Sequence, residues 1–452
     1  MTPTASPPTS PSTGAGAPAE GRPTGLLRLA TAGSVDDGKS TLVGRLLFDS
    51  KSVLRDQLAA VERVSLDRGM PRTDLALLTD GLRAEREQGI TIDVAYRYFA
   101  TPRRSFILAD CPGHVQYTRN TVTGASTADL VVLLVDARHG VVEQTRRHLA
   151  VAALLRVPHV VVAVNKIDLV DYSAEVYAQV AADIQDVARG LGLADARALP
   201  TSALEGDNIV TRSARTPFYT GPALLELLET ISVDPPEARQ PFRLPVQSVI
   251  RPQSAAPRGL EDFRGYAGQV AAGAVAIGDE VVALPSGRAT SVTGIHLGDR
   301  PLERAVTGQS ITIELADDID VSRGDLLAAP EGAPRPSRDV EASLAWLSDR
   351  PLRERDRVLV KHGTRTVQAV VTDIAGRLDL DDLALVEADG LSLNDIGRVR
   401  LRLSEAIPVA PYEHSRTDGA FLVIDAHDGW TLAAGMAHDP DEAPLAHPRE
   451  RS

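Results

Sequence analysis

The chain has little that would mark a secreted or membrane protein. Its 452 residues include a single cysteine, Cys111, so no internal disulfide can form. Its apolar stretches fall short of the roughly 20 residues that a membrane span needs. The N-terminus, MTPTASPPTSPSTGAGAPAEGRPTG, lacks the apolar core of a signal peptide. With few aromatic residues and an ordinary apolar content, the sequence predicts a globular protein of the cytoplasm with no membrane contact.

A basic excess is also missing. The chain carries 48 Lys and Arg against 61 Asp and Glu, a formal net charge of −13. Proteins that bind nucleic acids more often carry excess Lys and Arg, because these side chains contact phosphates. We therefore expect no nucleic-acid partner, although a local basic patch can occur in an acidic chain.

Proline-rich segments divide the sequence. SVDPPEARQP (232–241) and EGAPRPSRDV (331–340) separate regions with different apolar patterns. A tail rich in Pro, Ser, Thr, Ala and Gly precedes them and is predicted to be disordered. The predicted units are a disordered tail (1–24), a GTP-binding domain (25–235), a first β-barrel domain (241–332), a second β-barrel domain (338–440) and a polar tail (441–452).

The first large region has an α/β pattern. The apolar runs LLRLATAG, SFILADCPGH, ADLVVLLVDA and VPHVVVAVNKID each end in polar residues or glycine, as buried strands do. The stretches QTRRHLAVAALLRV and SAEVYAQVAADIQDVARGLG are typical of helices. Alternating strands and helices predict a parallel sheet covered on both faces. Ligands of such sheets bind at the carboxyl ends of the strands.

After the first linker the pattern changes to short strands and glycine turns, as in VVALPSGRATSVTGI. RVLVKHGTRTVQAVVTDI is typical of a hairpin that turns near His362 and Gly363. We therefore predict an α/β P-loop GTPase domain followed by two antiparallel β-barrel domains.

The end of the first predicted strand fits the phosphate-loop pattern G-x4-G-K-[ST]. Glycines let the backbone wrap an anion, and the N-terminus of the following helix favours negative charge. Lys39 is expected to reach the β- and γ-phosphates, and the Ser40 hydroxyl to bind Mg²⁺. The alternative is an ordinary glycine-rich turn that opens a helix. The residues of this predicted nucleotide-binding segment are Gly33, Ser34, Val35, Asp36, Asp37, Gly38, Lys39, Ser40 and Thr41.

A second strand ends in Asp110, Cys111, Pro112, Gly113 and His114. Asp110 is placed to hold Mg²⁺ through water, and the Gly113 N–H can face the γ-phosphate. The pattern D-x-x-G also describes many turns. Its position after a phosphate loop, at the end of a strand, favours a nucleotide contact.

A third strand ends in Asn165, Lys166, Ile167 and Asp168. The Asp168 carboxylate can accept from both N1–H and the 2-amino group of guanine, two donors that adenine does not match. The alternative is a turn or helix cap made by Asn and Asp. Further along, a backbone N–H within Ser202, Ala203 and Leu204 could meet guanine O6.

Thr91, within Gln88–Ile92, is the candidate switch threonine. Its hydroxyl would join the Mg²⁺ ligands only when the γ-phosphate is present. On local pattern alone it could equally be a β-branched strand residue.

In this order, the segments GSVDDGKST, EREQGITID, DCPGH, NKID and SAL resemble translation-type GTPases such as elongation factor Tu. The resemblance implies that His114 positions the attacking water and that Val35 and Ile90 are the apolar pair beside it. His114, Lys39 and Gly113 are therefore the candidate catalytic residues. The alternative for His114 is a solvent-facing loop histidine.

A narrower resemblance runs from about residue 26 to 436. The segments LLFDSKSVL, TDGLRAEREQGITIDVAYRYF, DFRGYAGQVAAG, KHGTR, LNDIGRV and DGAFLVID resemble the large, GTPase subunit of the bacterial heterodimeric sulfate adenylyltransferase (ATP sulfurylase). The resemblance implies GTP and Mg²⁺ as cofactors. It also implies a small catalytic partner subunit that makes adenylyl sulfate and diphosphate from ATP and sulfate.

Some members of that family carry a fused adenylyl-sulfate kinase. No second phosphate loop follows the third predicted domain, so we expect that activity to be absent. Two other functions fit residues 33–204. One is a translation factor that delivers an aminoacyl-tRNA, and the other is a nucleotide-binding regulator without hydrolysis. The segments DFRGYAG and LNDIG favour sulfate activation over the first, and His114 favours hydrolysis over the second.

Overall fold

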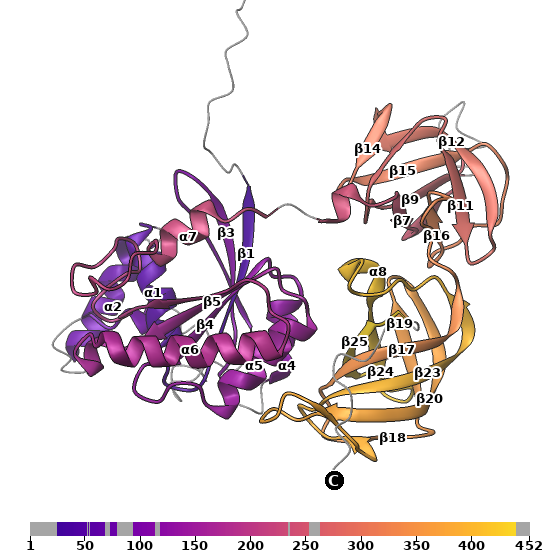
Figure 1. The fold of residues 1–452 in the computed structure, drawn as a ribbon. Helices are drawn as coiled ribbons and strands as arrows, with labels where there is room; N and C mark the ends of the chain where they lie inside the picture. Colours follow the sequence, from indigo (N-terminus) through magenta and orange to yellow (C-terminus); the bar gives the residue numbers. More distant parts are fainter. Residues whose placement is uncertain are drawn as a thin grey trace, which may run out of the picture.

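The computed structural model describes residues 25–51, 53, 55–67, 73–78, 94–113, 118–233, 236–252 and 263–439. These residues form an α/β domain followed by two β domains, and the third domain lies beside both of the others (Figure 1). The elements of the first domain are β1 (Leu26–Gly33), α1 (Lys39–Asp49), α2 (Arg55–Asp67), η1 (Leu75–Leu78), β2 (Ala95–Ala100), β3 (Ser105–Asp110), α4 (Thr118–Ser126), β4 (Leu130–Asp136), α5 (Glu143–Leu154), β5 (His159–Asn165), η3 (Ile167–Val170), α6 (Ala174–Gly190), β6 (Ala196–Pro200) and α7 (Leu224–Thr230).

The first domain is built on a six-stranded sheet in the order β2-β3-β1-β4-β5-β6. Side chains alternate between its faces, as the two-residue period of a strand requires. In β4, Val131, Leu133 and Val135 join the core under α4, α5 and α6, whereas Leu130 and Leu134 join the core under α1 and α7. Because both faces are covered, every residue of β4 is buried.

The predicted strands β1, β3, β4 and β5 and helices α5 and α6 are confirmed. The parallel sheet is also confirmed for β3, β1, β4, β5 and β6. The sequence reading missed β2, an antiparallel edge strand that pairs with β3 from Ala95↔Asp110 to Ala100↔Ser105. The short connection between them, in which the Thr101 N–H donates to the Arg104 carbonyl at 2.9 Å, leaves room only for an antiparallel return.

The second domain is a curled antiparallel sheet. Its strands follow the short helix η4 (Pro236–Arg239) and run in the order β7-β16-β11-β12-β15-β9-β8, and they enclose a core that includes Tyr266, Ile313 and Leu327. Its strands are β7 (Arg243–Pro245), β8 (Ser248–Ile250), β9 (Gly265–Gln269), β10 (Ala274–Ala276), β11 (Glu280–Leu284), β12 (Arg288–Leu297), β13 (Arg300–Pro301), β14 (Arg304–Val306), β15 (Ser310–Leu315) and β16 (Leu326–Ala328).

The elements of the third domain are β17 (Ser337–Trp346), β18 (Leu352–Arg353), β19 (Arg357–His362), β20 (Arg365–Leu378), β21 (Leu385–Val386), β22 (Gly390–Leu391), β23 (Ile396–Ile407), α8 (Arg416–Gly419), β24 (Ala420–Ile424) and β25 (Thr431–Ala437). The domain is a closed barrel, because β19 pairs with β24 on one side and with β20 on the other. The hairpin predicted to turn near His362 and Gly363 is confirmed, with His362 opposite Arg365. The barrel begins inside the second predicted linker, because Ser337 already pairs with Ile407 of β23.

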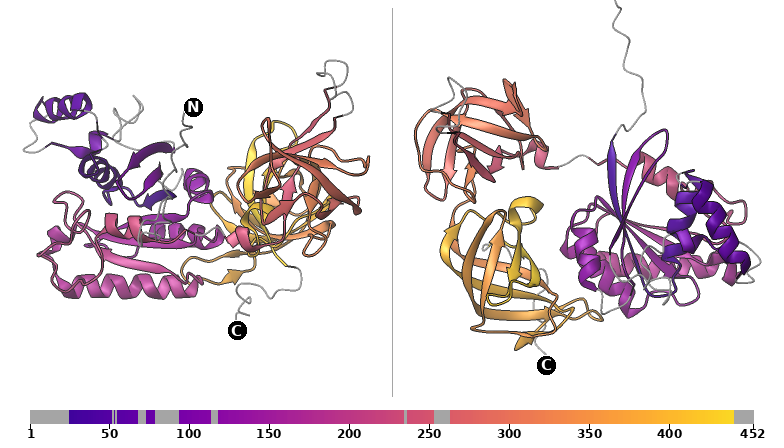
Figure 2. Two further views of the ribbon diagram at one scale, coloured as in Figure 1. Left: turned by 90° about the horizontal axis from the view of Figure 1, so that it is seen from above. Right: turned by 180° about the vertical axis from the view of Figure 1, so that it is seen from behind.

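Buried contacts join the second and third domains. Arg243 of β7 donates to the Asp418 carboxylate of α8 at 2.7 Å, and both side chains are almost fully buried. Arg365 also reaches Asp325 at 3.0 Å. The two β domains lie next to each other in all three views (Figures 1 and 2).

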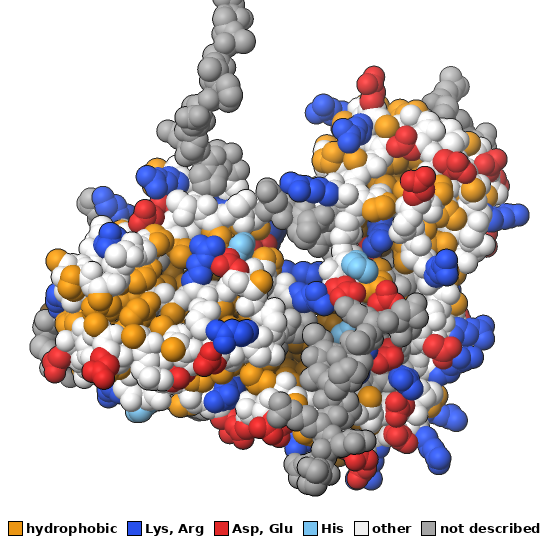
Figure 3. Space-filling model, viewed as in Figure 1, with side chains coloured by type: hydrophobic (Ala, Val, Ile, Leu, Met, Phe, Trp, Pro, Cys, Tyr) orange, Lys and Arg blue, Asp and Glu red, His pale blue; other side chains and the backbone are white. Residues whose placement is uncertain are grey.

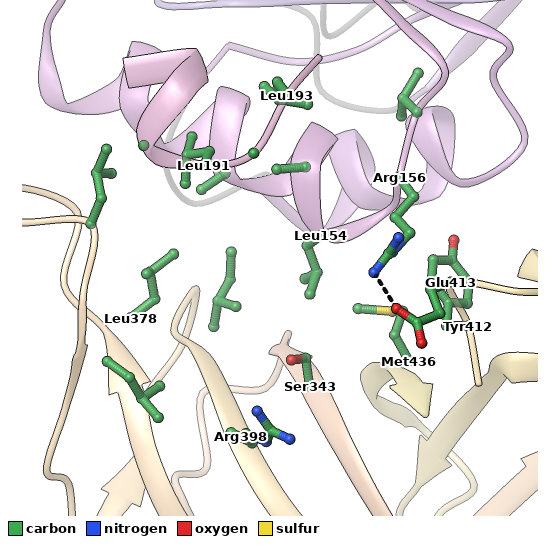
Figure 4. Close-up of a pocket in the computed structure, with 18 of the residues that line it drawn as sticks. Leu154, Arg156, Leu191, Leu193, Ser343, Leu378, Arg398, Tyr412, Glu413 and Met436 are labelled. Carbon is green, nitrogen blue, oxygen red and sulfur yellow. Dashed lines mark hydrogen bonds and ion pairs between the residues drawn. The ribbon is translucent and has the colours of Figure 1, made fainter. Parts of the chain in front are cut away.

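The first and third domains enclose a pocket of about 500 Å³ (Figure 4). The ends of α5 and α6 form one wall and the barrel forms the other. An ion pair of 3.0 Å between Arg156 and Glu413 spans its rim, and the Tyr412 hydroxyl donates to the Leu155 carbonyl at 3.0 Å. The apolar residues labelled in Figure 4 along its two walls are Leu154, Leu191, Leu193, Leu378 and Met436.

Acidic and basic side chains lie interspersed among the described residues on the face shown in Figure 3. Over the part of the chain that the structure describes, none of the helices has the length and apolar character needed to cross a bilayer.

Candidate nucleotide-binding site

The predicted phosphate loop connects β1 to α1 at the carboxyl edge of the sheet. Gly33 and Gly38 have φ angles of +144° and +95°, which side-chain-bearing residues rarely adopt. A Cβ on Gly38 would lie 2.5 Å from Nδ2 of Asn165. Glycine is therefore required at Gly38 both for the backbone turn and for the close approach of Asn165.

Lys39 is the first residue of α1, and its ammonium group contacts the backbone of the phosphate loop. Its Nζ donates to the carbonyls of Gly33 at 2.9 Å and Ser34 at 2.7 Å. Burial lowers the pKa of Lys39, and the charges of Asp37 and Asp110 oppose this shift. An ammonium has three donors, so these two carbonyls leave one for a phosphate oxygen.

Asp37 closes the loop on itself. Its carboxylate accepts from the Ser34 N–H at 2.7 Å, and burial raises the pKa of Asp37. Val35, at the top of the loop, is 41% exposed. The hydrogen bond from Ser34 to Asp37 therefore stabilises the loop, and the loop carries one apolar side chain that is exposed to solvent.

Gly113 packs directly against the phosphate loop. A Cβ at this position would lie 2.3 Å from Nζ of Lys39 and 2.7 Å from the Gly33 carbonyl oxygen. The structure thus brings the D-x-x-G segment to the phosphate loop, although almost 80 residues separate them in the sequence. A residue larger than glycine would displace Lys39.

The start of the same segment is buried at the end of β3. The Thr31 hydroxyl donates to the Asp110 carboxylate at 2.7 Å, in register with the strand pairing Thr31↔Asp110. Cys111 is 0% exposed, and burial raises the pKa of its thiol. Ser40 lies in the first turn of α1, and the Pro112 backbone carries the chain on to Gly113.

Asn165 links the phosphate loop to the segment predicted to meet guanine O6. Its Nδ2 donates to the Asp37 carbonyl at 2.7 Å, and its Oδ1 accepts from the Ala203 N–H at 2.9 Å. The buried amide of Asn165 therefore fixes the distance between the phosphate loop and the segment that contains Ala203.

Lys166 precedes η3, and Asp168 lies on it. Lys166 adopts a left-handed conformation with φ +60° and pairs with Asp136 at 3.0 Å. Ile167 is fully buried and anchors this turn. Asp168 is half-buried, and among the described residues its carboxylate has no hydrogen bond or ion pair, so both oxygens remain for a donor pair.

The segment from Ser202 to Leu204 lies beside Asn165. The Ser202 N–H donates to the Asp207 carbonyl at 3.2 Å, which closes a tight turn. Ala203 is buried, whereas Leu204 is 55% exposed. The structure thus gathers the predicted phosphate and guanine residues at one edge of the sheet.

Two predicted residues, Thr91 and His114, lie outside the described residues, as does Ile90. Their roles in Mg²⁺ binding and water positioning therefore stay predictions.

The sequence analysis did not single out Asp136 or His148. Asp136 is the last residue of β4, just as Asp110 and Asn165 are the last residues of β3 and β5. This shared position could have identified it from the sequence. Burial opposes ionisation of Asp136, but hydrogen bonds from Arg138 and Lys166 hold its pKa well below the usual range. His148 is a buried residue of α5, and burial followed by the charges of Lys39 and Arg147 lowers its pKa to about 3.

Comparison with known proteins assigns two segments of the chain to families. Residues 25–234 match the family described as elongation factor Tu GTP binding domain, and residues 339–438 match GTP-eEF1A C-terminal domain-like. A solved structure of sup35 complexed with GDP aligns with 92% of this chain and 94% of that chain, at 22% identity and a TM-score of 0.41.

Closer relatives share most of the sequence. The "Bifunctional enzyme CysN/CysC" of Mycobacterium tuberculosis is 51% identical over 415 residues, which are 91% of this chain and 67% of that protein. The "Sulfate adenylyltransferase subunit 1" of Alteromonas mediterranea is 47% identical over 416 residues, 92% of this chain and 87% of that protein. With an elongation factor Tu-type GTP-binding domain and this identity across all three domains, the chain belongs to the sulfate adenylyltransferase subunit 1 family.

Proposed function

We propose that this chain is the GTP-hydrolysing subunit of a sulfate adenylyltransferase. The observation that carries the proposal is the packing of Gly113 on Lys39, together with the Asn165 bridge between the phosphate and guanine segments. This arrangement suits a guanosine triphosphate, and it occurs in a chain that is 47% identical to a sulfate adenylyltransferase subunit 1 over 92% of its length.

Each residue has a proposed task in hydrolysis. Lys39 and the loop around it bind the β- and γ-phosphates, and the N–H of Gly113 meets the γ-phosphate. His114 orients the water that attacks the γ-phosphorus, which breaks the bond to the β-phosphate oxygen and yields GDP and phosphate. Asp168 accepts from N1–H and the 2-amino group of guanine.

Mg²⁺ is the proposed cofactor, and Ser40, Thr91 and Asp110 are its proposed ligands. Mg²⁺ typically uses one or two protein carboxylates together with phosphate oxygens and waters. The buried carboxylate of Asp110, at the end of β3, suits such a site. When bound, the ion neutralises charge on the phosphates.

The proposed partner is a small catalytic subunit that joins ATP and sulfate to give adenylyl sulfate and diphosphate, the first step of sulfate assimilation. GTP hydrolysis in this chain drives that unfavourable reaction. We place both subunits in the cytoplasm, in keeping with a single buried thiol. We expect neither nucleic acid nor membrane as a partner.

The test is to combine this chain with the small subunit, ATP, sulfate and GTP, and to measure adenylyl sulfate and GDP together. This chain alone should make no adenylyl sulfate. In the pair, GTP should raise adenylyl sulfate beyond the level reached without it, and ATP with sulfate should accelerate GDP release. If GDP release ignores ATP and sulfate but responds to ribosomes, a translation factor that delivers aminoacyl-tRNA is the better assignment.

A further inference from the structure

Arg45 ties the helix of the phosphate loop to the segment Ser202–Leu204. Its Nε donates to the Ala203 carbonyl at 3.2 Å, and its Nη2 donates to the Leu204 carbonyl. The side chain is 20% exposed, and its hydrogen bond to Ala203 is partly buried. A guanidinium presents its donors in a planar fork, which suits two neighbouring carbonyl oxygens.

The peptide groups of Ala203 are therefore held from both sides. Asn165 accepts from the N–H of Ala203, and Arg45 donates to its C=O. Asn165 is itself bound to the Asp37 carbonyl, and Arg45 stands on α1, which begins at Lys39. Both attachments thus lead back to the phosphate loop.

Apolar packing also attaches this segment to α1, because Ala203 lies in the buried core that includes Leu42 and Leu46. Leu204 is 55% exposed, and Gly206 has a φ of +86° with Cζ of Arg45 3.7 Å from where its Cβ would lie. The backbone bond between Ser202 and Asp207 closes the turn but does not attach it to α1.

We propose that Arg45 is a positioning residue for guanine. It holds the backbone of residues 202–204 at a set distance from the phosphate loop, so that one nucleotide meets both at once. This inference rests on the proposed function, because it assumes a guanine nucleotide with its 6-oxo group at residues 202–204.

The test compares Arg45→Met with Arg45→Lys. The methionine keeps the apolar stem and removes both hydrogen bonds, whereas lysine keeps the charge but not the fork. Asp49→Asn is the matched control, because it removes the distant partner of Arg45, at 3.9 Å, and leaves both carbonyl contacts. The measurement is dissociation of a fluorescent GDP analogue by stopped flow, with the melting temperature of each protein in nucleotide-free buffer.

Loss of two charge-assisted hydrogen bonds to the loop should accelerate GDP dissociation about tenfold in Arg45→Met. Arg45→Lys should lie between that variant and the wild type, and Asp49→Asn should match the wild type. The diphosphate of 2-aminopurine riboside lacks the 6-oxo group. Its dissociation should be fast from the wild type and no faster from Arg45→Met, a pattern that general destabilisation would not produce.

The outcomes separate the two proposals. A wild type that binds no guanine nucleotide overturns the proposed function. A wild type that binds GDP, with Arg45→Met and Arg45→Lys releasing it at the wild-type rate, overturns the role of Arg45. Equal acceleration for GDP and the 2-aminopurine nucleotide also overturns it, because the effect would not pass through the 6-oxo group.

Discussion

The carboxylate of Asp168 is expected to select guanine over other bases at this site. Asp168 is half-buried on η3, and a site built to pair buried donors rejects analogues that lack them by roughly 10⁴–10⁵. Asp168→Asn should therefore lower the affinity for GDP and raise the affinity for xanthosine diphosphate, whose 2-oxo group accepts from an amide. Equilibrium binding of both nucleotides measures this exchange, with the exposed Asp171→Asn as a control. Unchanged GDP affinity in Asp168→Asn would remove Asp168 from the site.

Gly113 and Lys39 should act as a pair, because a methyl group on Gly113 would lie 2.3 Å from the ammonium. Lys39→Ala should lower GTP affinity about 10- to 100-fold, as expected for one hydrogen bond to a charged group. Gly113→Ala should cause a comparable loss, but a smaller further loss in a Lys39→Ala background. Gly25→Ala, where nothing lies within 4 Å, is the control. Strict additivity of the two losses would mean that Gly113 acts independently of Lys39.

His114 is expected to affect hydrolysis rather than binding. If it only orients water, His114→Ala should keep GTP affinity within a few-fold. Single-turnover hydrolysis should fall by roughly 10²–10⁴, the usual contribution of a positioned acid–base group. Full hydrolysis in this variant would mean that another group orients the water.

At the scale of elements, strands were easier to predict than the contacts between them. Each run that became β1, β3, β4 or β5 is mostly apolar, because helices cover both faces of the sheet. The edge strand β2 carries exposed Tyr98 next to buried Phe99, and only its pairing with β3 distinguishes it from a loop. The bond from Asn165 to Asp37 joins residues 128 apart, which no local pattern can predict.

Helix α5 should make the first domain sensitive to acid. The pKa of buried His148 is about 3, against an ordinary value of 6.5. Below pH 6.5 the unfolded chain therefore binds a proton at His148 that the folded domain does not bind. The free energy of unfolding thus falls as the pH drops from 6.5 towards 3. Relative to His148→Gln, the wild type should lose about 2 kcal/mol of unfolding free energy between pH 6.5 and 5. Urea denaturation at several pH values measures the slope, and equal slopes for the wild type and His148→Gln would contradict the role of His148.

At the scale of the whole molecule, the two β domains depend on a buried ion pair. Arg243 and Asp418 meet at 2.7 Å with little exposure to water. Removing one partner of such a pair leaves an uncompensated charge and costs about 3–5 kcal/mol. Asp418→Ala should destabilise the two β domains by about this amount, and Arg243→Met with Asp418→Leu should destabilise them less. The exposed pair Arg189–Asp186 provides a control, since Asp186→Asn should change little. Equal losses in the single and double variants would show that the charge itself is not what matters.

Cys111 is the only thiol in the chain and lies wholly inside the first domain, between β3 and α4. A thiol reagent can reach it only when that part of the core opens. The rate of labelling therefore reports the free energy of opening at one known position, without any introduced probe. Ligands that bind the closed form must slow the labelling in proportion to their affinity. The labelling rate of Cys111 in the native protein therefore measures ligand binding. A single colorimetric thiol reagent can rank the affinities of GTP, GDP and their analogues.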